Sequence, residues 1–183
     1  MSCCVRWSNL RLRRVLIETI SLSSTNKILS REQLRRRVEE WRGAGEKITL
    51  ANGGFDLLHV GHVRYLRAAK ALGGKLIVAM NADDSVRALK GEGRPIMPAS
   101  ERAEIVAALA DVDAVVIFPE LDVRAIIREI RPDIQAKGTD YTADSVPERD
   151  EVAEYGGRVE IVGDPKDHST SEIFRSRLAP RRS

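Results

Sequence analysis

Hydrophobic and polar positions along this chain follow two alternating patterns. Five short runs are nearly all apolar, which is typical of strands buried on both faces of a parallel sheet. Between them lie longer segments in which apolar side chains recur every three or four residues, as in amphipathic helices. The strands are predicted at residues 47–52, 75–80, 113–118, 133–138 and 158–163. The alternation predicts an α/β fold, a Rossmann-like doubly wound sheet of five parallel strands with flanking helices.

Caps and breakers mark the ends of the predicted helices. "SREQ", beginning at Ser30, reads as a capping box with Gln33 at the third helical position. Ser100 is expected to cap a later helix, and Ser169 or Thr170 the last one. The helices are predicted to begin near residues 30, 62, 83, 100, 122, 147 and 169.

Charge is divided unevenly along the chain. Residues 1–47 carry eleven Lys or Arg and five Glu, whereas the remainder has a net charge of −3. Residues 1–29 show weak periodicity and many Ser and Arg, so we expect a basic, poorly ordered extension. One domain should cover residues 30–178, with a first helix over 30–43 and a core from residue 47, followed by a tail over 179–183. A basic arm can bind RNA, but no aromatic residues or nucleic-acid motif accompany it, and no nucleic-acid partner is expected.

The cysteines and the N-terminal segment bear on the compartment. Cys3 and Cys4 are adjacent and indicate neither a disulfide framework nor a zinc site. Glu18 interrupts the apolar run near the N-terminus, and no clean cleavage site follows, so a signal peptide is not predicted. No stretch is long enough to span a bilayer. We expect a cytoplasmic protein with no membrane partner.

The segment "NGGFDLLHVGH", residues 52–62, concentrates the candidate chemistry. Gly53 and Gly54 allow a tight turn and a close approach by a ligand. A helix then begins, and its unpaired N–H groups and positive dipole end favour an anion. His59 and His62 add side-chain donors there, which suits a polyphosphate and a phosphoryl-transfer transition state. A histidine pair at this spacing can also bind a metal, but no third ligand lies nearby in the sequence.

"GGFDLLHVGH" closely resembles the signature of the nucleotidyltransferase superfamily with the His-x-Gly-His motif. Four further segments resemble, in the same order, those of bacterial heptose 1-phosphate adenylyltransferases, which occur alone or as the C-terminal half of a bifunctional kinase/adenylyltransferase. The chain is similar to the stand-alone form, since its length leaves no room for a sugar-kinase domain. The segments are "LKGEGRP" at 89–95, "SERAEIVAAL" at 100–109, "RPDIQAKGTDY" at 131–141 and "HSTSEI" at 168–173.

The resemblance implies transfer of AMP from ATP to heptose 1-phosphate, which releases pyrophosphate and gives ADP-heptose. It also implies Mg²⁺ bound to the triphosphate and a homodimer. No carboxylate cluster in the sequence indicates a protein metal site. A cytidylyltransferase acting on glycerol 3-phosphate or another small alcohol phosphate is the alternative within the family. Two alternatives lie outside it: a nucleotide-binding regulator without turnover, and an RNA-binding module built on the basic arm.

The resemblance also assigns roles to single residues. His59 and His62, with Lys90, are the expected catalytic residues, because the motif histidines contact the triphosphate in the family. Asp56 is expected to orient the turn or the histidines, although a purely structural turn aspartate is an equal alternative. Arg94 and Tyr141 are expected to bind the sugar phosphate. The expected nucleotide-binding residues are Gly53, Gly54, Phe55, Asp56, Gly61, Arg102, Lys137, Gly138, Asp140, Ser169, Thr170 and Ser171.

Two positions depart from patterns common in the superfamily. Gly54 stands where many cytidylyltransferases have Thr, which favours the adenylyl branch. Phe174 stands where many members carry a basic residue, which removes one expected phosphate contact and agrees with the sugar branch. The sequence leaves the nucleobase and the acceptor open.

Overall fold

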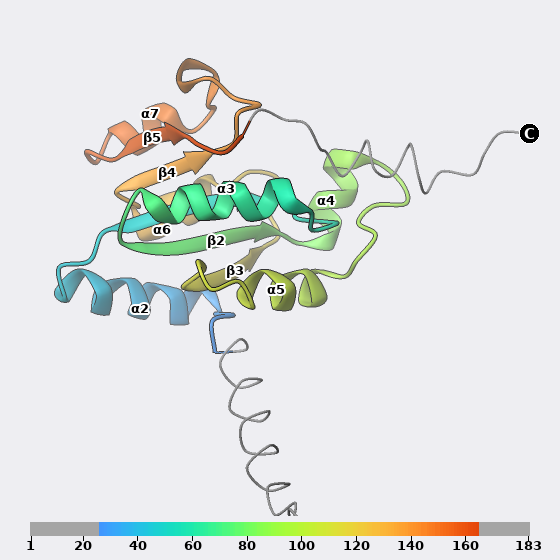
Figure 1. Ribbon diagram of the computed structural model, residues 1–183, viewed down its shortest axis with the longest axis horizontal. Helices are drawn as coiled ribbons and strands as arrows, with labels where there is room; N and C mark the ends of the chain where they lie inside the picture. Colours follow the sequence, from blue (N-terminus) through green and yellow to red (C-terminus); the bar gives the residue numbers. More distant parts are fainter. Residues whose placement is uncertain (1–25, 165–183) are drawn as a thin grey trace, which may run out of the picture.

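The computed structural model describes residues 26–164, and these form one parallel sheet flanked by helices (Figure 1). The strand order is β3-β2-β1-β4-β5, and every neighbouring pair is parallel. The predicted fold class is therefore confirmed. The strands are β1 (Ile48–Gly53), β2 (Lys75–Asn81), β3 (Ala114–Phe118), β4 (Ile134–Lys137) and β5 (Arg158–Ile161).

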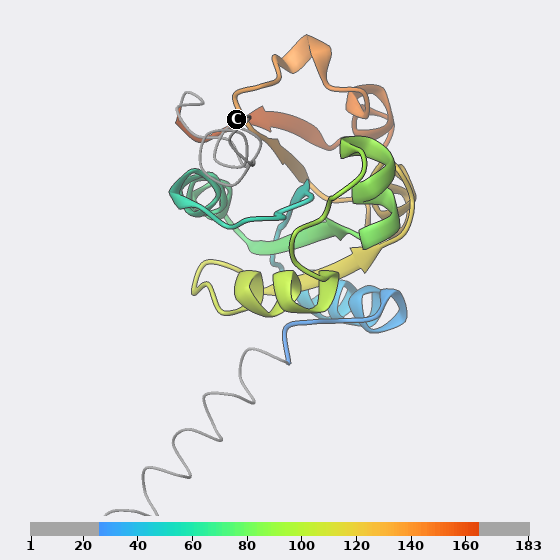
Figure 2. The same cartoon turned by 90° about the vertical axis from the view of Figure 1, so that its right-hand side faces the viewer.

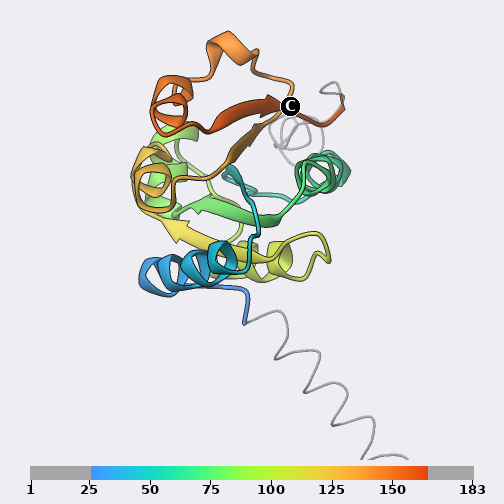
Figure 3. The same cartoon turned by 90° about the vertical axis from the view of Figure 1, so that its left-hand side faces the viewer.

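Helices cover both faces of this sheet. Between the strands and before them lie α2 (Arg31–Gly43), α3 (Val60–Ala71), α4 (Asp83–Lys90), α5 (Ala99–Ala107), α6 (Arg124–Ile130), a 3₁₀ turn η1 (Ala143–Ser145) and α7 (Arg149–Ala153). The views from the two ends of the sheet place α3 and α5 on one face and α2, α6 and α7 on the other (Figures 2 and 3). The short helix α4 lies beyond the carboxyl ends of the strands (Figure 1).

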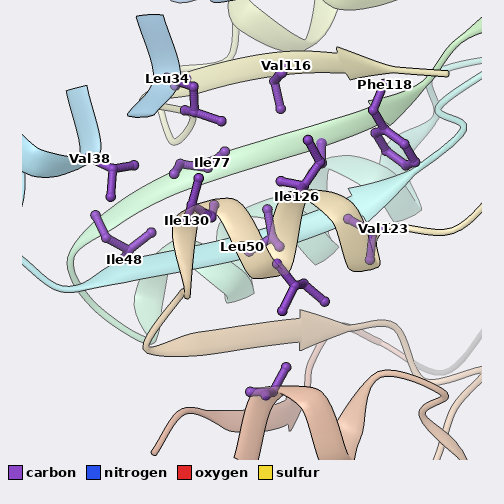
Figure 4. Close-up of a cluster of buried hydrophobic side chains, with 14 residues drawn as sticks. Leu34, Val38, Ile48, Leu50, Ile77, Val116, Phe118, Val123, Ile126 and Ile130 are labelled. Atoms are coloured by element: carbon purple, nitrogen blue, oxygen red, sulfur yellow. The ribbon is translucent and has the colours of Figure 1, made fainter. Parts of the chain in front are cut away.

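Each face has its own apolar core. On the α2, α6 and α7 face, Leu50 and Ile77 of the sheet pack with Ile126 and Ile130 of α6 (Figure 4). On the α3 and α5 face, alternate strand residues such as Ala51 and Val78 pack against helix side chains. This two-sided burial explains why the central strands read as continuous apolar runs rather than as alternating patterns.

Most predicted helix boundaries agree with the structure to within a few residues, and the capping box at Ser30 is present as predicted. Ser100, however, was expected to cap a helix and does not: α5 begins at Ala99 with Pro98 at its cap position, and Ser100 lies inside the first turn. Proline is tolerated at a helix start because the first N–H groups of a helix have no acceptor within it. The N–H that proline lacks therefore costs no hydrogen bond. The helix predicted from residue 62 also begins earlier, with His59 as its N-cap.

The folded part of the chain starts before residue 30. Ile28 forms a parallel bridge with Val115 on the edge strand β3. The amide of Leu29 donates to the carbonyl of Val115 at 2.8 Å, and the amide of Val115 donates to the carbonyl of Lys27 at 2.8 Å. Residues 27–29 thus cover part of an edge strand, although residues 1–29 were expected to form a poorly ordered extension.

Several expectations concern residues outside the described part of the chain. These are the basic extension up to residue 25, with Cys3 and Cys4, and the helix predicted from residue 169 with its tail. Among residues 26–164, no helix has both the length and the apolar character required to cross a bilayer.

Candidate active site

A cavity of about 630 Å³ opens at the carboxyl ends of the strands. Its lining includes the ends of β1 and β4 and the start of α3. The chain leaves β1 toward α3 on one face, whereas β4 is entered from α6 on the other face, so the strand order reverses between these neighbours. In open α/β sheets, ligands bind in the crevice at this reversal.

The Gly-rich turn after β1 forms the floor of the cavity. Gly53, Gly54 and Phe55 all line it. Phe55 has a φ of 44°, a left-handed conformation rare for a bulky side chain, and its ring is buried. Lys90 is the last residue of α4, and its amino group lies beside the Gly-rich turn. A Cβ at position 54 would lie 3.5 Å from Nζ of Lys90. The structure thus brings the turn and Lys90 together.

His59 and His62 lie side by side on the cavity wall. Their rings stack with centroids 3.9 Å apart and an interplanar angle of 27°. His62 also meets the ring of Phe55, at 5.1 Å between centroids. Nδ1 of His59 accepts a hydrogen bond from the amide of Gly61 at 3.2 Å, which makes His59 the N-cap of α3. With Nδ1 acting as an acceptor, the proton of the neutral ring belongs on Nε2, which is then a donor.

Asp56 is buried outside the cavity lining and holds a loop. Its carboxylate accepts hydrogen bonds from the amides of Ile96 at 2.6 Å and Met97 at 3.3 Å. Arg94, which was expected to bind the sugar phosphate, forms an ion pair with Asp56 at 2.7 Å and is only 7% exposed. Neither residue borders the cavity. The structure therefore supports the structural alternative for Asp56, and it gives Arg94 a position in the loop anchor rather than in the cavity.

Arg102 also lies away from the place expected for a phosphate ligand. Its guanidinium is buried and donates to the carbonyls of Gly54, Asn81 and Met97 and to the carboxylate of Asp83 at 2.6 Å. Arg102 does not line the cavity. These bonds tie the Gly-rich turn to the end of β2, to the first turn of α4 and to the loop before α5. We therefore assign Arg102 the role of holding the Gly-rich turn in position.

The "KGTDY" segment reaches the cavity, since Lys137, Gly138, Asp140 and Tyr141 all line it. Nζ of Lys137 lies 3.1 Å from Oε2 of Glu148, and both side chains are nearly fully buried. The same ammonium lies 5.2 Å from the centroid of the Tyr141 ring. Burial, followed by the charges of Asp140 and Glu148, raises the pKa of Tyr141, so its hydroxyl stays protonated at neutral pH.

Several lining residues were missed by the sequence analysis. Tyr65 lies one turn after His62 on the same face of α3, so helical periodicity would have found it. Its hydroxyl donates to the carbonyl of Ala136 at 2.8 Å, and burial raises its pKa above the usual value. Glu148 gave no local signal, because its role depends on an ion pair across the fold. The other missed polar residues are Asn52, Arg64, Asn81, Asp122, Arg124, Thr139 and Asp164.

The predicted phosphate contacts Ser169, Thr170 and Ser171 lie outside the described residues. Within residues 26–164, no three His, Cys, Asp or Glu side chains are grouped in a way that would hold a metal ion.

The cytidylyltransferase-like family model matches residues 50–176, the span that holds the Gly-rich turn, both histidines and the "KGTDY" segment. The chain belongs to this family of nucleotidyltransferases. Two relatives named "Bifunctional protein HldE" are similar to this chain in sequence. That of Methylobacillus flagellatus is 45% identical over 155 residues, covering 85% of this chain and 32% of the relative. That of Syntrophotalea carbinolica is 46% identical over 154 residues, covering 84% and 31%.

The chain thus spans about a third of the length of the curated relatives that it matches. A solved structure supports the fold assignment. The crystal structure of the lipopolysaccharide core biosynthesis protein from Thermoplasma volcanium is 31% identical, with a TM-score of 0.55, and the match covers 64% of this chain and 95% of that one.

Proposed function

We propose that this cytidylyltransferase-like protein transfers AMP from ATP to a sugar 1-phosphate, specifically heptose 1-phosphate, with release of pyrophosphate. The observation that carries the proposal is the stacked pair His59 and His62 at the start of α3, beside the Gly-rich turn and Lys90. Imidazole donors, an ammonium group and a helix N-terminus converge there, and each favours the charge of a polyphosphate.

The proposed reaction is a single displacement at the α-phosphorus. A phosphate oxygen of the sugar forms a bond to this phosphorus, the bond to the bridging oxygen of pyrophosphate breaks, and pyrophosphate leaves with that electron pair. The nucleophile is already an anion, so no strong general base is required. His59, His62 and Lys90 act by aligning the phosphates and neutralising the charge that builds up on their oxygens.

The choice of nucleotide and acceptor is supported by similarity. The relatives named HldE match most of this chain, and the structural neighbour is titled a lipopolysaccharide core biosynthesis protein. The segments around Lys90, Arg102 and Tyr141 resemble those of heptose 1-phosphate adenylyltransferases in sequence and order. Gly54, where many cytidylyltransferases have Thr, favours ATP.

Magnesium is proposed to enter with the substrate, as the complex of Mg²⁺ with the triphosphate. Carboxylates are the side chains that Mg²⁺ prefers. Asp140, an expected nucleotide-binding residue, lies in the lining, and its carboxylate suits a ribose, a sugar hydroxyl or a magnesium-bound water. When bound, the ion supplies positive charge to the leaving pyrophosphate.

A pyrophosphate-release assay tests the proposal. The purified protein is given Mg²⁺ with ATP or CTP, each combined with heptose 1-phosphate or glycerol 3-phosphate. We expect turnover with ATP and heptose 1-phosphate and little with the other three pairs. Turnover with CTP and glycerol 3-phosphate alone would retain the mechanism and overturn the substrate assignment. Absence of turnover with all four pairs, in a protein that still binds ATP, would favour a regulator without catalysis.

A further inference from the structure

The lining of the cavity includes two groups of polar residues. The histidine side, as named here, consists of Gly53, Gly54, His59, His62 and Lys90. The other side, here called the Glu148 side, consists of Asn52, Asp122, Arg124, Lys137 and Glu148. The two sides belong to one continuous cavity, so a single pair of substrates can occupy both.

Strand register places the Glu148 side on the α6 and α7 face of the sheet. Ala51 pairs with Ala136, and both pack in the core on the α3 face. Successive strand residues point to opposite faces, so the next residues on the two strands, Asn52 and Lys137, point together toward the α6 and α7 face. Glu148 reaches Lys137 from just before α7.

Positive charge on the Glu148 side is already neutralised by protein carboxylates. Lys137 forms its ion pair with Glu148 at 3.1 Å. Arg124 forms an ion pair with Glu151 at 2.8 Å and donates to the carbonyl of Pro147 at 2.9 Å. A phosphate gains little from cations held in this way, so the phosphates belong on the histidine side. The Glu148 side suits an uncharged polar group.

Two buried oxygens on this side have lone pairs that the protein leaves unused. Within the described residues, Oδ1 of Asn52 accepts no hydrogen bond, and the contact of Oε2 of Glu148 is its ion pair with Nζ of Lys137 at 3.1 Å. Buried acceptors are nearly always satisfied in native proteins, by protein, water or ligand. A ligand with several hydroxyl groups supplies the donors that these two oxygens require.

Building on the proposed function, we infer that Asn52 and Glu148 bind the hydroxyl groups of the acceptor sugar, and that they make the enzyme specific for a polyhydroxylated acceptor. Glu148 accepts a charge-assisted hydrogen bond from one hydroxyl, and Asn52 accepts a second. Lys137 holds the carboxylate of Glu148 in place. Both residues act on acceptor binding and do not take part in the chemical step.

The nucleoside is assigned to a different part of the lining. Gly138 and Thr139 after β4, and Val162 and Gly163 after β5, form a strip of small side chains and accessible backbone. A planar base fits such a strip, where backbone groups can read its edge. The acceptor must approach the α-phosphorus opposite the leaving pyrophosphate, so a separate side of the cavity is required for it.

Steady-state kinetics of Glu148→Gln tests the inference, because this change keeps the shape of the side chain and removes its charge. The KM for heptose 1-phosphate should rise about tenfold, while the KM for ATP changes less than about twofold. Asn52→Ala should show the same split and covers the case in which Glu148→Gln fails to fold. The control is Glu154→Gln, an exposed glutamate at the end of α7 outside the cavity, which should leave both KM values unchanged.

A rise in the KM for ATP alone would assign the Glu148 side to the nucleoside and overturn the inference, as would two unchanged KM values. A calorimetric titration of heptose 1-phosphate, with a non-hydrolysable ATP analogue present, separates the inference from the proposed function. Binding that weakens about tenfold in Glu148→Gln supports the inference even if the wild type shows no turnover. A wild type that does not bind the sugar phosphate would overturn the inference.

Discussion

At the scale of single residues, the polar side chains predicted for the site divide into two groups. Asp56, Arg94 and Arg102 satisfy backbone groups or each other and hold the loops around the cavity. His59, His62 and Lys90 border the cavity itself. A charged residue within a recognisable motif can therefore act by fixing the shape of the site and need not touch the ligand.

Arg102→Met tests this division. The change removes hydrogen bonds to three backbone carbonyls and leaves Asp83 without its partner, so the free energy of unfolding should fall by about 3 kcal/mol. Urea denaturation measures this loss. A phosphate ligand would behave differently: its removal would raise the KM for ATP and leave the unfolding free energy nearly unchanged.

The motif residues that meet at the start of α3 have partners close along the chain. Gly53, Gly54, His59 and His62 lie within ten residues, so the motif alone brings them to one turn. Glu148 and Arg102 meet partners 11 and 48 residues away, at Lys137 and Gly54. Those contacts depend on how strands and loops pack, and a local pattern carries no record of that packing.

At the scale of elements, the sequence predicts only some of the helix N-caps, because a cap also depends on the local backbone geometry. At Ser30 the full capping box forms, with Gln33 Oε1 accepting from the Ser30 amide and Ser30 Oγ accepting from the Gln33 amide. At Ser100 a similar serine lies inside the helix, because Pro98 two residues earlier already takes the cap position. Two serines with the same apparent role thus have different effects.

The pair Ser30→Ala and Ser100→Ala turns this difference into a measurement. Loss of the cap at Ser30 should lower the free energy of unfolding by about 1 kcal/mol. The change at Ser100, exposed in the first turn of α5, should stay within about 0.5 kcal/mol. Equal losses in the two variants would contradict the assigned helix start.

The bridge between residues 27–29 and β3 leads to a second prediction at this scale. A chain that begins at residue 30 should be less stable than one that begins at residue 26, by about 2 kcal/mol. It loses two backbone hydrogen bonds to Val115 and the packing of Ile28 and Leu29. Thermal unfolding of the two truncated chains measures the difference, and equal melting temperatures would show that the bridge contributes nothing.

At the scale of the whole molecule, burial on both faces of the sheet creates the site and also limits stability at high pH. Burial raises the pKa of Tyr155 to about 12 and that of Tyr65 beyond the usual range. Between about pH 10 and pH 12 the folded chain therefore binds more protons than the unfolded chain. The contribution of these two tyrosines to the free energy of unfolding is fully present below pH 10 and is lost as the pH rises through this window.

Tyr155→Phe should reduce this alkaline loss. The hydroxyl of Tyr155 has no hydrogen-bond partner among the described residues, so its removal should cost little at pH 8. The urea midpoint of the variant should then decline less than that of the wild type between pH 8 and pH 11. The remaining decline comes in part from Tyr65. Identical declines in the two proteins would contradict the assignment.

The most direct test of the central claim is the rate of pyrophosphate release by the double variant His59→Asn, His62→Asn. Asparagine is a good N-cap residue, so α3 should keep its start and the melting temperature should stay close to that of the wild type. We expect the rate of nucleotidyl transfer to fall by about a thousandfold or more, because two donors to the transition state are lost. A folded double variant whose rate stays within a few-fold of the wild type would contradict the claim that this histidine pair carries the reaction.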